Sequence, residues 1–199
     1  MLEKRRQLPQ DQGRDTDYFI YCLEAVPEIE TDKLTETQEN LGQLAMKYGV
    51  ASIYKTCDTI EGLESSLNAL VLDDHNFKDY EIIYLVMAGE ANSICLNGYY
   101  YSLQEIAELF EGRLKGKILH FSNEKILDLD EDEAQYFLDI TNAKAISGYG
   151  NAYKGISSVN LDKAFFNLFK EDDNMFDVVE ELHQRHYNVC KLLDFRLYY

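Results

Sequence analysis

Covalent chemistry in this sequence would depend on two side chains, Cys95 and His120, since a thiol beside an imidazole can act as a nucleophile with its base. Cys95 follows a few residues after Gly89, and His120 is flanked by Leu119 and Phe121. No Lys or Arg lies within several residues of Cys95 to stabilise a thiolate, which is the reactive form. We therefore interpret Cys95 as structural and His120 as a hydrogen-bonded core residue. A cysteine hydrolase built on this pair is the alternative.

Metal ligands are a second option, but their patterns fit structural roles better. His183, His186 and Cys190 fall on one side of a predicted helix, where they could hold zinc, yet apolar residues on the same side mark it as a packing face. The acidic run 128–133 lacks the ligand order and central glycine of a calcium-binding loop, and its charges favour a helix N-terminus instead. No glycine-rich phosphate loop occurs. The sequence thus predicts no metal and no cofactor.

Alternating strands and helices must position these side chains. Apolar, aromatic and β-branched segments predict strands over 18–25, 51–57, 80–89, 117–123, 144–149 and 195–198. Helical spacing of apolar residues predicts helices over 34–48, 60–71, 103–114, 131–141 and 175–193, with another that begins near 161. Strands joined through helices imply right-handed crossovers between parallel strands. We predict an α/β fold of three layers, an αβα sandwich with helices on both faces of a mainly parallel central sheet.

A small β-hairpin is predicted near 93–102. Asn97-Gly98 separates two short apolar runs, and this dipeptide favours a tight turn because both positions need a positive φ. Ser102 and Glu105 then form a capping box at the start of the next helix. The hairpin is rich in tyrosine, a residue that is enriched in contact surfaces.

The charge balance excludes several classes of partner. The 199 residues include 19 Lys and Arg against 36 Asp and Glu, so the formal net charge is −17. Phosphate backbones and anionic membranes would be repelled, and no apolar run is long enough to span a bilayer. We expect a cytoplasmic protein with free cysteines and with neither a nucleic-acid nor a membrane partner. Residues 1–17 are polar and lack an apolar period, so we expect a flexible leader before a single domain, 18–199.

Several segments carry a resemblance to a known family. They are the strand end 85–90, the Asn97-Gly98 hairpin, the helix region 102–112, the strand 118–122 and the segment 147–149. Together with the order of the elements, they resemble the caspase-like (CHAT-like, clan CD) cysteine peptidase fold, and most closely small bacterial proteins of unknown function within it. The resemblance covers about 18–199 and implies the caspase-like form of the three-layer fold.

The catalytic positions of that family are degenerate in this sequence. Active members carry a histidine before the glycine that closes the third strand and a cysteine just past the fourth strand. These positions fall here on Ala88, beside Gly89, and at about Glu124. Alanine cannot transfer a proton, and glutamate cannot replace a thiol nucleophile. The resemblance therefore implies an inactive pseudo-peptidase with no catalytic residues.

Ligands of open α/β sheets bind beyond the carboxyl ends of the strands. The predicted binding crevice is formed there by Met87, Ala88, Gly89, Glu90, Ser122, Asn123, Glu124 and Tyr149. Its acidic rim would suit a protein or peptide partner with basic segments, and the resemblance suggests a bacterial stress or defence pathway. A structural subunit that oligomerises through an edge strand or through Tyr198-Tyr199 is the remaining alternative.

Overall fold

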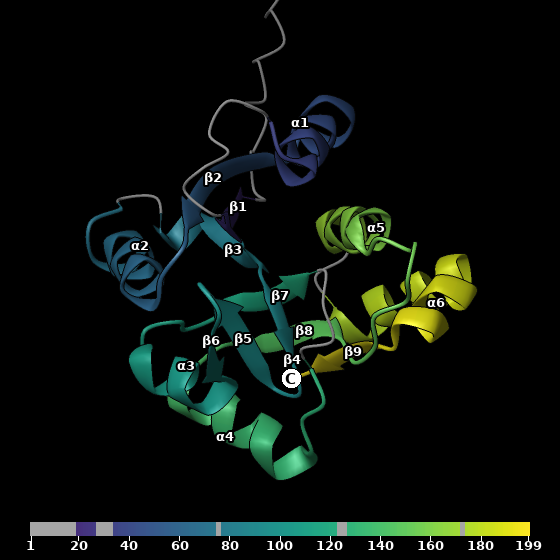
Figure 1. The fold of residues 1–199 in the computed structure, drawn as a ribbon. Coiled ribbons are helices and arrows are strands. Elements are labelled where there is room, and N and C mark those ends of the chain that lie inside the picture. Colours follow the sequence, from purple (N-terminus) through teal and green to yellow (C-terminus); the bar gives the residue numbers. More distant parts are fainter. Residues whose placement is uncertain (1–18, 27–33, 75–76, 123–126, 172–173) are drawn as a thin grey trace, which may run out of the picture.

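A computed structural model describes residues 19–26, 34–74, 77–122, 127–171 and 174–199 (Figure 1). The predicted leader and the crevice residues Asn123 and Glu124 lie outside these ranges. Within them, no helix combines the length and the apolar character that crossing a bilayer requires.

The central sheet has six strands in the order β2-β1-β3-β7-β8-β9. They are β1 (Phe19–Ala25), β2 (Ala51–Cys57), β3 (Tyr80–Val86), β7 (Ile118–Ser122), β8 (Ala145–Tyr149) and β9 (Phe195–Tyr198). Neighbouring strands are parallel except β9, which runs antiparallel to β8. The mainly parallel sheet that the sequence predicts is confirmed.

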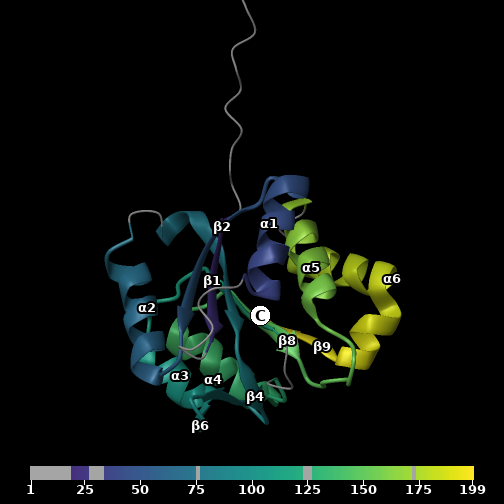
Figure 2. The same ribbon diagram turned by 45° about the horizontal axis from the view of Figure 1, so that its top comes forward.

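Helices cover both faces of this sheet, so the predicted three-layer α/β architecture is confirmed (Figure 1, Figure 2). One face carries α2 (Ile60–Leu72), α3 (Leu103–Leu109) and α4 (Glu131–Thr141). The other face carries α1 (Glu36–Tyr48), α5 (Val159–Glu171) and α6 (Met175–Leu193). The 3₁₀ turn Phe77–Asp79 leads directly into β3.

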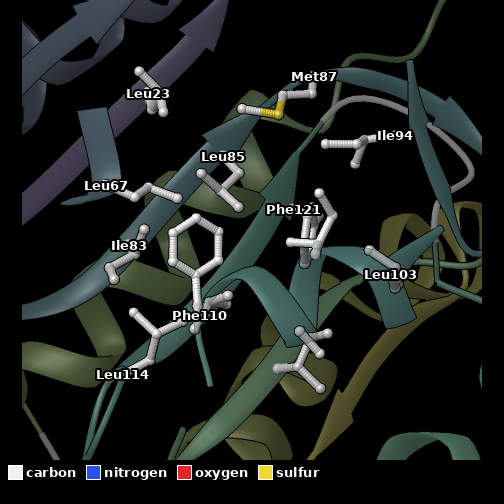
Figure 3. Close-up of a cluster of buried hydrophobic side chains, with 14 of the residues drawn as sticks. Leu23, Leu67, Ile83, Leu85, Met87, Ile94, Leu103, Phe110, Leu114 and Phe121 are labelled. Carbon is white, nitrogen blue, oxygen red and sulfur yellow. The ribbon is translucent and has the colours of Figure 1, made fainter. Parts of the chain in front are cut away.

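Alternation of side chains along the buried strands supplies both layers with a core. Leu85 of β3 and Phe121 of β7 belong to the core beneath α2, α3 and α4 (Figure 3). Tyr84 of β3 belongs to the opposite core, and His120 of β7 packs there against the ring of Phe165. The prediction that His120 and Phe121 point to opposite faces of the sheet is therefore confirmed.

The segment 80–89, predicted as one strand, forms two. β3 ends at Val86, and the chain then enters β4 (Ala88–Glu90), which pairs antiparallel with β5 (Ser93–Leu96). β6 (Tyr99–Ser102) completes a separate sheet in the order β4-β5-β6, which we call the ribbon. The predicted hairpin is confirmed, but it has a third strand because the chain leaves the main sheet to pair with β5.

Two predicted helices differ in detail. The helix predicted over 103–114 ends at Leu109, where α3 is capped by Phe110, while Leu114 still reaches the core. The spacing of apolar residues over 175–193 predicts that Phe176 lies on the packing face of α6, but Phe176 is 62% exposed. Met175 and Val178 are buried in its place, and the backbone of α6 departs from helical geometry at His186. An ideal helical period applied along α6 therefore assigned Phe176 to the wrong face.

Candidate functional site at the carboxyl edge of the sheet

The crevice residues contributed by the end of β3 lie in two different environments. Met87 is 2% exposed and packs in the core beside Leu85 and Ile94 (Figure 3). Ala88 and Glu90 are exposed on β4, and Gly89 between them is half-buried. Ala88, which the resemblance in sequence predicts to be the histidine position of active members, thus presents a methyl group at the surface of the ribbon.

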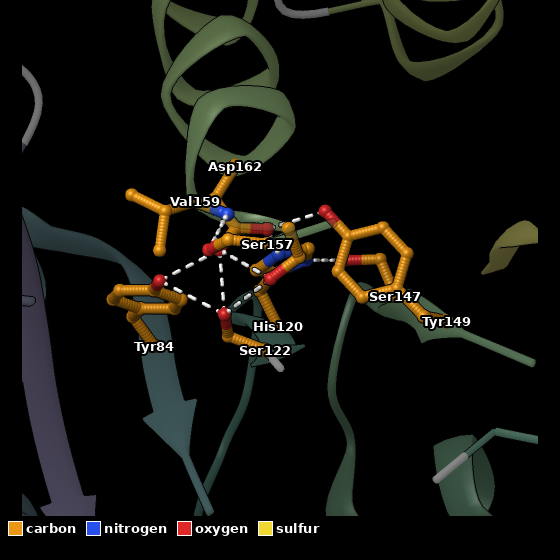
Figure 4. Close-up of polar contacts among 9 residues, drawn as sticks. Tyr84, His120, Ser122, Ser147, Tyr149, Ser157, Val159 and Asp162 are labelled. Atoms are coloured by element: carbon orange, nitrogen blue, oxygen red, sulfur yellow. Dashed lines mark hydrogen bonds and ion pairs between the residues drawn. The ribbon is translucent and has the colours of Figure 1, made fainter. Parts of the chain in front are cut away.

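Ser122 and Tyr149, the crevice residues at the ends of β7 and β8, are sealed inside the protein. Their exposed fractions are 0% and 1%, and both side chains face the layer of α5. Each donates a hydrogen bond to the carboxylate of Asp162, which α5 brings down onto the sheet (Figure 4). Met87 and Tyr149 consequently belong to the two opposite cores of the molecule.

Asp162 is the centre of this polar network and is 1% exposed. Its Oδ1 atom lies 2.9 Å from His120 Nε2 and also accepts a hydrogen bond from the Tyr149 hydroxyl. An ionised carboxylate can only accept, so the His120 Nε2 atom carries a proton and donates it to this bond. One carboxylate oxygen therefore joins α5 to both β7 and β8.

The second carboxylate oxygen of Asp162 accepts hydrogen bonds from three hydroxyl groups. Oδ2 lies 2.7 Å from the Tyr84 hydroxyl, 2.5 Å from Ser122 Oγ and 3.2 Å from Ser158 Oγ. Ser122 Oγ in turn lies 2.9 Å from Ser158 Oγ. Throughout the described ranges, every buried side-chain nitrogen and oxygen has a hydrogen-bond partner. The network is therefore fully satisfied, which is the condition under which a buried charge is tolerated.

A hydroxyl, an imidazole and a carboxylate are aligned in this network. Ser147 Oγ lies 2.8 Å from His120 Nδ1, and the other ring nitrogen contacts Asp162. The same order of groups activates serine nucleophiles in hydrolases. Here the exposed fractions of Ser147, His120 and Asp162 are 0%, 0% and 1%, so a substrate carbonyl has no path to the hydroxyl. The arrangement fixes the imidazole and joins α5 to the sheet.

The charges of the network shift its pKa values in a consistent way. Burial alone would raise the pKa of Asp162, but hydrogen bonds from His120, Ser122 and Tyr149, together with the electrostatic interaction with His120, lower it below its usual range. Burial, followed by the negative charge of Asp162, raises the pKa of Tyr149 well above its usual range. Asp162 is therefore ionised and Tyr149 neutral at physiological pH, as their hydrogen bonds require.

Sequence reasoning identified His120 and Ser122 but missed Asp162 and Tyr84. A signal for Asp162 was present, because it stands three and four residues before Phe165 and Phe166, both buried on α5. An acidic residue within the apolar stripe of a helix indicates a buried partner. Tyr84 carried no such signal, since a tyrosine in a buried strand is unremarkable in sequence.

Cys95 lies away from the network. It stands on the central strand of the ribbon, paired with Ala88 on one side and with Tyr100 on the other, and it is half-buried. Both ring nitrogens of His120 are engaged by Ser147 and Asp162. The Cys95 thiol and the His120 imidazole, which the alternative hydrolase hypothesis pairs, therefore have different neighbours in the structure.

An open hollow lies between the ribbon and helices α3 and α4, and we call it the ribbon groove. Its volume is about 500 Å³, and its lining includes Asn92, Ser93, Leu103, Leu129, Asp132, Glu133, Tyr136 and Phe137. Leu103, Leu129 and Phe137 are buried apolar residues at its base. Asp132 and Glu133 are exposed on the first turn of α4. The groove therefore joins an apolar base to a negatively charged side.

Asn92 fixes the shape of this groove. It lies in the tight turn between β4 and β5, where Ala91 and Asn92 adopt positive φ values of 48° and 61°. The Asn92 side chain donates to the carbonyl of Asp128 at 3.0 Å, and its Oδ1 accepts the Asp128 amide at 2.6 Å. The Asn92 carbonyl accepts the Leu103 amide at 2.8 Å. One residue thus connects the ribbon to α3 and to the segment before α4.

Comparison with known proteins agrees with the fold and leaves the activity open. No curated protein matches this chain. The crystal structure of the Drosophila initiator caspase Dronc is similar, with a TM-score of 0.54 at 11% identity over 86% of this chain and 73% of that chain. This likeness shows the fold alone, which is caspase-like, as the resemblance in sequence predicted. The model of a family of unknown function (DUF6642) matches residues 17–199, and the chain therefore belongs to that family.

Proposed function

We propose that this protein is a caspase-like domain without peptidase activity that binds a basic segment of a partner protein in the ribbon groove. The observation that carries the proposal is the separation of the candidate general base, His120, from the open surface. Ala88, the residue that the resemblance assigns to the histidine position of active members, lies on the exposed ribbon, whereas His120 is enclosed with Asp162 inside the core. A general base that is sealed in the core cannot reach a peptide bound outside.

The groove itself supports the binding half of the proposal. Its volume of about 500 Å³ falls within the range of ordinary ligand sites. Its apolar base offers surface from which a bound partner can displace water. Exposed Asp132 and Glu133, on a chain of net charge −17, favour a partner segment with Lys or Arg. Tyr136, 39% exposed at the rim, supplies an aromatic anchor of the kind that dominates binding energy.

Binding is tested by fluorescence polarisation with a library of short peptides that carry Lys or Arg among apolar residues. Basic peptides should bind, and their acidic counterparts should not. Asp132→Lys should weaken the selected peptides at least about tenfold, because a repulsion replaces an attraction beside the bound cation. Glu61→Lys is the matched control, since Glu61 is also exposed in the first turn of a helix but lies on α2. An equal loss in both variants would show general attraction to an acidic surface and would contradict the groove.

The aromatic anchor has its own pair of variants. Tyr136→Ala should weaken the same peptides, whereas Tyr153→Ala, at a tyrosine 53% exposed elsewhere, should leave them unchanged. If neither tyrosine matters, the peptides bind outside the groove.

The absence of peptidase activity is tested separately. The protein is incubated with peptide probes that carry a thiol-reactive group, and each cysteine is examined by mass spectrometry. We expect no probe-dependent adduct. An adduct at Cys95 that Cys95→Ser abolishes, with cleavage of a matching peptide, would instead establish the relocated hydrolase.

A second candidate function, assembly with another copy of this chain, is favoured by the position of β9 at the edge of the sheet, as far as the described residues form it. β9 is the last strand of the six-stranded sheet, and a largely apolar hollow of about 640 Å³ adjoins it. Phe176 and Tyr199 line that hollow and are 62% and 68% exposed. Light scattering should then detect a dimer that Phe176→Lys disrupts, with Tyr187→Lys, at a tyrosine 59% exposed on the same helix, as the control. A monomer at all concentrations would remove this candidate.

A further inference from the structure

A third hollow, on the other face of the sheet from the ribbon groove, is built by α1, α5 and α6, and we call it the three-helix pocket. These helices lie side by side in both views of the fold (Figure 1, Figure 2). The pocket has a volume of about 290 Å³. Its polar lining includes Gln43, Lys47, Lys163, Asn167, Arg185 and His186.

The lining contrasts with the rest of the protein in its charge. The chain has 36 Asp and Glu against 19 Lys and Arg, yet none of the lining residues in the described part of the chain is an Asp or a Glu. Lys47, Lys163 and Arg185 converge on it from three different helices, together with His186. Cations brought together within an acidic protein create a local positive potential that attracts small anions.

Lys163 is positioned without being neutralised. Its Nζ atom donates to Asn40 Oδ1 at 2.9 Å and to Gln43 Oε1 at 3.2 Å, and both acceptors are uncharged amides on α1. A carboxylate at either position would cancel the ammonium charge of Lys163. An amide oxygen orients the ammonium group by a hydrogen bond and leaves its charge uncompensated. The neighbouring Lys170 has a different task, since it donates to the Tyr48 carbonyl at the end of α1.

Among the residues that the structure describes, Arg185 pairs only through its Nε atom, which leaves most of its donors for a ligand. Its Nε atom pairs with Glu181 at 2.6 Å, and the side chains are 52% and 43% exposed. An exposed pair of this kind contributes little energy and exchanges readily with other anions. The guanidinium group offers further N–H donors in a planar fork that matches the oxygens of a phosphate group.

The wall of the pocket contains the one irregularity of α6. His186 has φ −129° and ψ 29°, which are not helical values, in the middle of a helix that contains neither proline nor glycine. Interruptions within helices, such as π-bulges and 3₁₀ stretches, often mark functional sites or hinges. The kink and the cluster of cations are independent observations that meet at the same pocket.

From this geometry we propose that the three-helix pocket binds the phosphate group of a small metabolite. A volume of about 290 Å³ accommodates a phosphate with a small organic group and excludes a folded partner. The net charge of −17 keeps long polyanions away from the surface as a whole, so a small phosphate ester enters where a nucleic acid does not. This site is separate from the ribbon groove and does not depend on the proposed peptide binding.

Calorimetry with four probes tests the proposal: inorganic phosphate, ribose phosphate, adenosine monophosphate and adenosine. The three phosphate-bearing probes should bind, adenosine should not, and affinity should fall as salt is added. The relative affinities of the three phosphates report whether the sugar or the base adds contacts. If no phosphate-bearing probe binds, or if adenosine binds as well as its phosphate, the proposal is overturned.

Single charge-removing variants locate the site. Lys163→Gln and Arg185→Gln should each weaken the phosphate probes about tenfold, because each removes a charge-assisted hydrogen bond. Lys191→Gln removes the same charge from an exposed position of α6 outside the pocket and should change affinity less than about twofold. Thermal unfolding of the three variants confirms that each folds. Equal weakening in all three would mean that the probes respond to overall charge, which contradicts the assigned site.

Discussion

The polar network around Asp162 and the ribbon groove lie on opposite faces of one sheet and differ in access to solvent. The network contains the residues with catalytic chemistry, and its members His120, Ser122 and Ser147 are 0% exposed. The groove is open, and its lining within the described ranges consists of residues suited to recognition, with no histidine or cysteine among them. In this caspase-like fold, the imidazole and the hydroxyl groups of the network stabilise the core, whereas the ribbon groove is open to solvent.

The largest effect should follow from removing the centre of the network. Asp162→Ala should lower the free energy of unfolding by about 3–5 kcal/mol, because His120, Tyr149 and Tyr84 lose a buried charged partner. Urea denaturation measures the loss, with the exposed Asp177→Ala as the control. A loss below about 1 kcal/mol would mean that the network does not hold α5 on the sheet.

Lowering the pH should reproduce part of the stability loss expected for Asp162→Ala. Because the pKa of Asp162 is lowered in the folded protein, its contribution to stability is complete above the unfolded pKa, about 4, and is lost as the pH falls through the folded value. The unfolding free energy measured by urea denaturation should therefore fall more steeply below about pH 4 in the native chain than in Asp162→Asn. Parallel curves for the two proteins would assign acid sensitivity to other carboxylates.

A smaller loss should follow from removing one donor of the network. Tyr149→Phe deletes the hydroxyl that bonds Asp162 and should cost about 1.5–3 kcal/mol, the value of a hydrogen bond to a charged group. Tyr99→Phe, at a tyrosine 68% exposed on the ribbon, should change the unfolding free energy by less than about 0.5 kcal/mol. Similar losses at both tyrosines would remove the contrast between the sealed network and the open ribbon.

The smallest effect should be local to the groove. Asn92→Ala removes both bonds to Asp128 and strains a residue at φ 61°, so the Asp128 amide should exchange its hydrogen faster while amides of β7 keep their protection. Asn92→Gly relieves the strain but still lacks the side chain. If the Asp128 amide exchanges its hydrogen at the same rate in Asn92→Gly as in the native chain, the side-chain bonds of Asn92 do not hold the groove in shape.

Local patterns in the sequence predicted the elements well where the deciding contacts are close along the chain. Asn97-Gly98 forms the expected turn, with φ values of 49° and 81°, and Ser102 with Glu105 forms the expected capping box. The split of 80–89 into two strands was not predicted, because pairing of Ala88 with Cys95 decides it. The kink at His186 was missed for a similar reason, since the sequence of α6 contains no helix breaker.

The sequence by itself determined the layered α/β fold, because the period of apolar residues decides which side of each strand or helix is buried. The resemblance in sequence further predicts that Ala88 stands where active caspase-like peptidases carry a histidine. Only the tertiary structure decided that Asp162, 42 residues from His120, would meet that ring and enclose it. Contacts of this kind depend on how α5 crosses the sheet, and no local periodicity records the partner of a buried charge.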